Sequence, residues 1–165
     1  MPSLREITLE YHAQDILDGL DLPALHYLAF KYVDVINDGD PYRSLYSLIL
    51  RSKPSLRALE SDSNVVHTDF FLSSLAKLDQ LESLVIIEPQ REGRGVYLST
   101  DMVLSRMTAP TLAPQLKQVE FRFPANHDTY PQGLLPSLRA LQQSRKGCQI
   151  HLYRVTADGI IEVGS

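Results

Sequence analysis

The sequence has little of what marks several large classes of protein. It contains one cysteine, Cys148, so it cannot form an internal disulfide and does not need an oxidising compartment. None of its Asn37, Asn64 and Asn126 is followed two positions later by Ser or Thr, so no glycosylation acceptor is present. The N-terminal region has no apolar stretch of signal-peptide length, and no run approaches the ~20 apolar residues of a membrane span. We therefore expect an intracellular protein, cytoplasmic or nuclear, with no membrane contact.

Basic character is missing as well. The formal net charge is -4, and no run of lysine and arginine offsets it. Proteins that bind phosphate backbones usually carry a positive surface, so we expect no nucleic-acid partner. The length of 165 residues suits a single domain covering 1–165, long enough to bury a core if its units stack on each other.

Signatures of catalysis and metal binding are also lacking. The segment Gly93-Arg94-Gly95 has neither the further glycine nor the Lys-Ser/Thr pair of a phosphate loop, which predicts a solvated loop. Cys148 has no histidine close in sequence and is predicted to be a buried or turn thiol. No two histidines have the i, i+4 spacing that would favour a zinc site; they are His12, His26, His67, His127 and His151. We expect no enzyme activity, no cofactor and no metal.

What the sequence does contain is a repeated apolar ladder, Leu-x-x-apolar-x-apolar, which in most copies follows a proline by two residues. Such spacing places alternate residues on one side of a short strand, and each copy is followed by a segment of helical periodicity. The ladders are Leu4-Ile7-Leu9, Leu25-Leu28-Phe30, Leu56-Leu59, Leu81-Leu84-Ile86 and Leu116-Val119-Phe121. They predict an α/β fold, a short irregular leucine-rich-repeat solenoid with a parallel sheet of five or six strands and helices on the opposite face.

Local signals refine the predicted elements. Asp40 and Pro41 predict the start of a helix, since Asp accepts a hydrogen bond at an N-cap and Pro fits the first turn. Over 13–20, a helix with Ile16, Leu17 and Leu20 on one face is predicted. Ser61 stands where an apolar residue should close the third ladder. Pro-Ser-Leu-Arg-Ala-Leu occurs at 54–59, predicted as strand, and at 136–141, predicted as helix because 149–155 alternates like a closing strand.

The joints between ladders resemble the leucine-rich-repeat region of fungal F-box-like proteins. They read Leu20-Asp-Leu-Pro-Ala-Leu-His-Tyr-Leu, Leu48-Ile-Leu-Arg-Ser-Lys-Pro-Ser-Leu-Arg-Ala-Leu and Leu78-Asp-Gln-Leu-Glu-Ser-Leu. The resemblance implies repeats that select a substrate while an N-terminal F-box docks onto a ubiquitin-ligase scaffold. No F-box pattern precedes the first ladder, so scaffold binding is expected only if this chain is a fragment with an F-box upstream. At the ninth repeat position, where the consensus has Asn or Cys, only Asn64 matches.

The residues between the apolar positions of each ladder should face away from the helices, because side chains alternate along a strand. This free face is either simply solvated or a surface that binds a protein, since exposed Tyr, Ile and Arg are the residue types that anchor interfaces. The candidate binding residues are Tyr27, Lys31, Glu60, Ile87, Glu120, Arg122, His151 and Tyr153. If this face is not used, the loop at 91–96 is the next candidate.

Two other interpretations remain open. A compact doubly wound α/β domain with a small-molecule or enzymatic site at its strand ends would need a Gly-rich turn directly after a strand. The turns at 33–37, 66–68 and 124–127 contain none. The chain could also be a degenerate repeat fragment without an independent function.

Overall fold

The computed structural model describes residues 3–33, 40–63, 68–87, 100–124, 134–156 and 159–164. The loop at 91–96, which includes Gly93-Arg94-Gly95, lies outside these ranges, as do the residues Asn64, His67 and His127. In chain order the elements are β1 (Glu6–Glu10), a 3-10 helix η1 (Tyr11–Asp15), α1 (Ile16–Gly19), β2 (Tyr27–Val33), α3 (Pro41–Ser52), β3 (Ala58–Ser63), α4 (Thr68–Leu75), β4 (Ser83–Ile87), α5 (Thr100–Met107), β5 (Gln118–Pro124), α6 (Leu134–Ser144), β6 (Gln149–Thr156) and β7 (Gly159–Gly164).

The strands form one open sheet of seven strands whose order follows the chain, β1 to β7. From β1 to β6, each strand runs parallel to the next one. This confirms the expected parallel arrangement, in which a helical segment connects each strand to the next. The last strand, β7, was not predicted. It pairs antiparallel with β6, so the sheet has seven strands rather than five or six.

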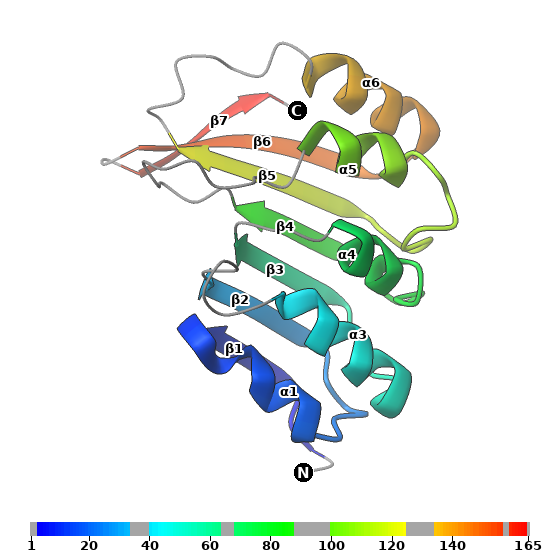
Figure 1. The fold of residues 1–165 in the computed structure, drawn as a ribbon. Coiled ribbons are helices and arrows are strands. Elements are labelled where there is room, and N and C mark those ends of the chain that lie inside the picture. The colour runs from blue at the N-terminus through cyan, green and yellow to red at the C-terminus, as the bar shows by residue number, and fades with distance from the viewer. Residues whose placement is uncertain are drawn as a thin grey trace.

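The helices lie in a single layer on one face of the sheet (Figure 1). Each helix contacts the next one along the chain, α1 with α3, α3 with α4, α4 with α5 and α5 with α6. Among the described residues, no helix has the length and apolar character needed to cross a bilayer.

The core lies between this helix layer and the sheet, and the ladder residues line up across the strands. One transverse row begins at Ile7, which is partly exposed, and continues through five buried residues, Leu28, Leu59, Leu84, Val119 and Ile150. The next row contains Ser61, which is 2 % exposed, between larger apolar neighbours. The hydroxyl of Tyr42 from α3 donates a hydrogen bond to Ser61 Oγ. The interruption of the third ladder is therefore a buried polar position with its own partner.

Helix α3 begins as predicted, with Asp40 Oδ1 accepting the Tyr42 backbone N–H at 2.9 Å. The segment after β1 differs from the prediction, because it starts as a 3-10 helix and continues as one turn of α-helix. A 3-10 helix has three residues per turn, so Gln14 and Leu17 share the inner side. Both are buried, whereas Ile16 is 54 % exposed. The prediction that Ile16 and Leu17 share one face was wrong, because Leu17 is fully buried and Ile16 is not.

The two copies of Pro-Ser-Leu-Arg-Ala-Leu adopt the two structures expected of them. The first leads into β3, and the second lies inside α6. In both copies the two leucines are buried: Leu56 and Leu59 in the first, Leu138 and Leu141 in the second. Two leucines three residues apart can share one face of a helix, and they can also occupy the first two apolar positions of a ladder. The local sequence is therefore compatible with either structure.

Arginines join neighbouring helices at their carboxyl ends. Arg51, in the last turn of α3, donates to the carbonyls of Leu17 and Leu20 at the end of α1. Arg145, directly after α6, donates to carbonyls at and beyond the end of α5. Helix ends leave carbonyl groups without partners in their own helix, so each arginine satisfies groups that belong to a preceding unit.

Candidate functional site: the helix-free face of the sheet

The side of the sheet opposite the helices carries the residues that alternate with the core. Parallel register places them in three transverse rows. The first row consists of Glu6, Tyr27, Ala58, Ser83, Gln118 and Gln149. The second consists of Thr8, Ala29, Glu60, Val85, Glu120 and His151. The third consists of Asp62, Ile87, Arg122, Tyr153 and Glu162. Most side chains in these rows are partly exposed, although Ala29 is fully buried.

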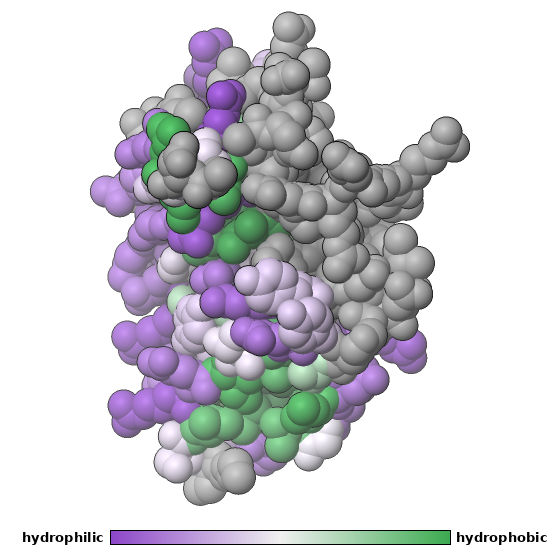
Figure 2. All heavy atoms as spheres, turned by 90° about the vertical axis from the view of Figure 1, so that its left-hand side faces the viewer, coloured by the Kyte–Doolittle hydropathy of each residue, from purple (hydrophilic) through white to green (hydrophobic). Residues whose placement is uncertain are grey.

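Figure 2 looks along the sheet from the end where the parallel strands finish. The margin away from the helices, on the left, is mostly hydrophilic. Strand β4 contributes apolar side chains to this polar face, since Val85 and Ile87 are both partly exposed there. The face therefore combines charged groups with a small apolar area, as non-obligate protein interfaces commonly do.

An ion pair occupies the centre of the face. Arg122 Nη2 lies 2.7 Å from Glu120 Oε2, and Arg122 Nε donates to the same oxygen at 3.2 Å. Gln118 Nε2 donates to the other carboxylate oxygen at 2.6 Å. The side chains of Arg122 and Glu120 are only 25 % and 14 % exposed, so solvent competes weakly for these bonds and their geometry is well fixed.

Next to this ion pair, β6 and β7 supply a second polar cluster. His151 Nδ1 lies 2.9 Å from Glu162 Oε1, and the rings of His151 and Tyr153 stack with centroids 6.0 Å apart. Partial burial raises the pKa of Tyr153, and the carboxylates of Glu162 and Glu120 raise it further. Glu162 was missed because β7 was not predicted. The dipeptide Asp158-Gly159, a strong hairpin signal, could have revealed it.

Toward the other end of the face, the Tyr27 hydroxyl donates to Glu60 Oε2 at 3.1 Å. Burial raises the pKa of Tyr27, and the neighbouring Glu60 carboxylate raises it further. Tyr27 lies on β2 and Glu60 on β3, so this hydrogen bond connects the two strands on the helix-free face of the sheet.

Lys31 lies apart from the other candidate residues. Its register partner is Glu10 on β1, and the register between β2 and β3 shifts between Phe30 and Val33. Tyr32, inside this shift, has a left-handed backbone with φ 56. The structure therefore brings together Ile87, Glu120, Arg122, His151 and Tyr153, places the pair Tyr27 and Glu60 beside them, and leaves Lys31 near the edge of the sheet.

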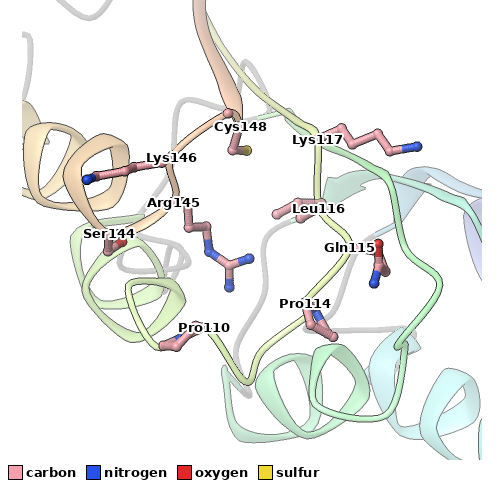
Figure 3. A pocket seen from close by; sticks show the side chains of 10 residues that line it. Pro110, Pro114, Gln115, Leu116, Lys117, Ser144, Arg145, Lys146 and Cys148 are labelled. Atoms are coloured by element: carbon pink, nitrogen blue, oxygen red, sulfur yellow. The ribbon is translucent and has the colours of Figure 1, made fainter.

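The described part of the chain also has cavities on the helix side. One of about 340 Å³ opens where the connections enter β5 and β6, and the Arg145 side chain extends into it (Figure 3). Its guanidinium is committed to backbone carbonyls, and burial raises the pKa of Cys148, so the thiolate is disfavoured. The cavity also lies at the amino ends of the strands, opposite to where open α/β sheets bind ligands.

A second cavity, of about 450 Å³, lies between α1 and α3 and is lined by both acidic and basic side chains, among them Asp15, Asp18, Asp40, Arg43 and Arg51. Within the residues that the structure covers, no three His, Cys, Asp or Glu side chains gather closely enough to hold a metal ion.

Comparison with known proteins adds no relative: no family model, curated protein or solved structure matches the chain. The fold is that of an α/β protein with an open, mostly parallel sheet, helices on one side and a polar face on the other.

Proposed function

We propose that this protein is a short leucine-rich-repeat-like solenoid that binds an intracellular protein partner through the helix-free face of its sheet. The observation that carries the proposal is the third row of that face. It places Ile87, Arg122 and Tyr153 side by side on three neighbouring strands, partly exposed and with Glu162 at its end. Aliphatic, aromatic and arginine side chains of this kind supply most of the energy of protein interfaces.

The surroundings of these residues favour binding. The carboxylate of Glu120 holds the Arg122 side chain in place, and stacking against His151 orients Tyr153. Side chains that are already ordered lose less conformational entropy when a partner binds. The rows also extend over several strands as a surface, whereas small-molecule sites are concave and enclose most of their ligand. A protein partner fits this geometry best.

The specific version of the proposal is recognition of a substrate for an F-box type ubiquitin ligase. It is supported by the inter-repeat joints and by the order of the strands, which follows the chain as successive repeats would. Contact with a ligase scaffold enters this version only if an F-box lies upstream. The doubly wound alternative has less support, because the strand order never reverses in the described sheet and so provides no topological switch point.

A pair of variants tests the proposal. The first combines Tyr27→Ala, Ile87→Ala and Arg122→Gln, where Gln keeps a donor for Glu120. The control makes matched changes on the helix side, Phe70→Ala, Leu50→Ala and Arg106→Gln, all at exposed positions.

Partners are captured from lysate with the immobilised wild-type chain, identified by mass spectrometry and then measured by titration with the purified partner. We expect the first variant to weaken binding at least ~100-fold, since anchors of this kind contribute about 2 kcal/mol or more each. The control should bind like the wild type, and both variants should stay within ~1–2 kcal/mol of the wild-type unfolding free energy. A partner that is lost by the control and kept by the first variant would contradict the proposal, and the loop at 91–96 would then be mutated.

A further inference from the structure

Strand β1 forms one edge of the sheet, and within the described residues no strand pairs with its outer side. The carbonyl of Arg5 accepts the backbone N–H groups of His26 and Tyr27, so this residue faces β2. Alternation along a parallel strand then directs the backbone groups of Glu6, Thr8 and Glu10 outward. An edge of this kind is a template for an added strand.

The side chains along this edge are acidic on the helix-free face. Glu6 and Glu10 are both exposed, with the exposed Thr8 between them. On the helix side, Ile7 is partly exposed, although its register partner Leu28 is fully buried. Together with Ile16, Ile7 leaves apolar surface at this end of the molecule, beside two carboxylates. Figure 2 shows hydrophobic side chains gathered at this end, near the bottom of the view.

Two tyrosines mark the carboxyl end of the edge. Tyr11 and Tyr32 directly follow the register pair Glu10 and Lys31, and their rings stack with centroids 5.7 Å apart. Both have left-handed backbones, with φ 55 and 56, although they are not glycines, and conformations of that kind cost on the order of 1 kcal/mol each. Their side chains are 58 % and 56 % exposed. Backbone strain that presents exposed aromatic rings is typical of binding surfaces rather than of core packing.

The geometry of this stack determines what it can bind. Tyr32 belongs to β2 and Tyr11 directly follows β1, so the two stacked rings, both exposed, lie together at the carboxyl end of the β1–β2 pair. The face of a tyrosine ring attracts cations, and the nearby carboxylate of Glu10 adds to that attraction.

We propose that the outer edge of β1 binds an extended basic peptide segment of a partner protein, which adds an eighth strand to the sheet. Lysine or arginine side chains at alternate positions of the segment lie beside Glu6 and Glu10, and the one next to Glu10 contacts the exposed ring of Tyr11. Apolar residues between them cover Ile7 on the helix side. Main-chain hydrogen bonds supply affinity in this mode of recognition, and the side chains supply specificity. Pairing of two copies is disfavoured, because a two-fold axis through Thr8 would set Glu6 of each copy opposite Glu10 of the other.

The probe is a fluorescein-labelled peptide with the core Lys-Val-Thr-Val-Arg, and its matched control has the core Glu-Val-Thr-Val-Glu. Fluorescence anisotropy against the full chain should show saturable binding of the basic peptide, at least about tenfold tighter than the acidic one and weaker at high salt. Thr8→Pro should abolish binding, because proline removes an outward N–H and leaves the bonds to β2 in place. Thr8→Val is the matched control and should bind normally.

The decisive variant is Glu6→Lys combined with Glu10→Lys, which should reverse the preference so that the acidic peptide binds more tightly than the basic one. A misfolded chain cannot produce such a reversal. The proposal is overturned if the basic peptide does not bind the wild type, if Thr8→Pro leaves its affinity unchanged, or if sedimentation shows a dimer that Thr8→Pro dissociates, which would make a second copy the occupant. The variant of Tyr27, Ile87 and Arg122 should bind the peptide normally, so this test is independent of the one above.

Discussion

Replacing Arg145 by methionine should destabilise the fold more than its position just after α6 suggests. The side chain is 8 % exposed, and its guanidinium donates to four backbone carbonyls. The bond to Met107 is 2.7 Å long, and those to Ala109 and Ala113 are both 3.0 Å long, with a fourth to Leu112. These carbonyls lie at the end of α5 and in the turn that follows it, where the helix itself offers no donors.

The magnitude follows from these four bonds. A buried acceptor that loses its donor costs about 1–3 kcal/mol, and the bonds to Ala109 and Leu112 are only partly buried, so water can replace part of what these two carbonyls lose. Removing a buried guanidinium also relieves its desolvation, which lowers the pKa of Arg145 in the folded chain. Taking the low end of the range for each bond and subtracting that relief, we expect a loss of about 2–4 kcal/mol in unfolding free energy.

Urea denaturation followed by circular dichroism measures this loss. Arg139→Met is the matched control, because Arg139 lies on the exposed side of α6, the helix that ends just before Arg145, and it should change stability by less than ~0.5 kcal/mol. Arg145→Lys should be intermediate, since an ammonium keeps the charge but cannot reproduce the planar fork of donors. If Arg145→Met is as stable as Arg139→Met, the four bonds do not contribute as reasoned.

Two further predictions concern the core and the free face. Leu84→Ala, at a fully buried position, should cost ~2–5 kcal/mol in chemical denaturation, whereas Val85→Ala on the opposite face should cost less than ~1 kcal/mol; the reverse order would indicate a register slip of one residue. Tyr27→Phe should lower the free energy of unfolding by about 1 kcal/mol at pH 7, because it removes the hydrogen bond to Glu60. Because folding raises the pKa of Tyr27 above its ordinary value of 10.0, that residue stabilises the fold fully below pH 10 and loses its contribution as pH rises further. Between pH 8 and pH 10.5, the free energy of unfolding measured in urea should therefore decrease less for Tyr27→Phe than for the wild type. Equal decreases would argue against a raised pKa of Tyr27.

The strands and their order could be predicted because the ladder combines two periodicities in a short stretch. Residues such as Leu84 and Val119 occur at alternate positions before a segment of helical spacing, and both proved to be fully buried. The phase of the first helix could not be predicted in this way, because a 3-10 start changes which residues share a face. The polar Ser61 looked like a defect in its ladder because its partner, Tyr42, comes from another element.

For the candidate site, the sequence predicted which face of the sheet each residue occupies but not which residues contact one another. Alternation along single strands placed Glu120, Arg122 and His151 on the free face. Their partners depend on the register between strands and on β7, which lacks a leucine ladder and follows a hairpin instead. The separation of Lys31 likewise depends on the irregularity in β2, which no spacing of apolar residues in the sequence indicates.

The order of the strands also has a consequence for how the chain folds during synthesis. In the part of the sheet that the structure describes, each strand after β1 pairs with the one made just before it, so none of these pairings requires the two ends of the chain to meet. Contacts between segments close in sequence form faster, because less loop-closure entropy is lost before they are made. Each unit can therefore pack onto the preceding one as it leaves the ribosome. A chain synthesised as far as Ile87 already contains both members of every strand pair from β1 to β4.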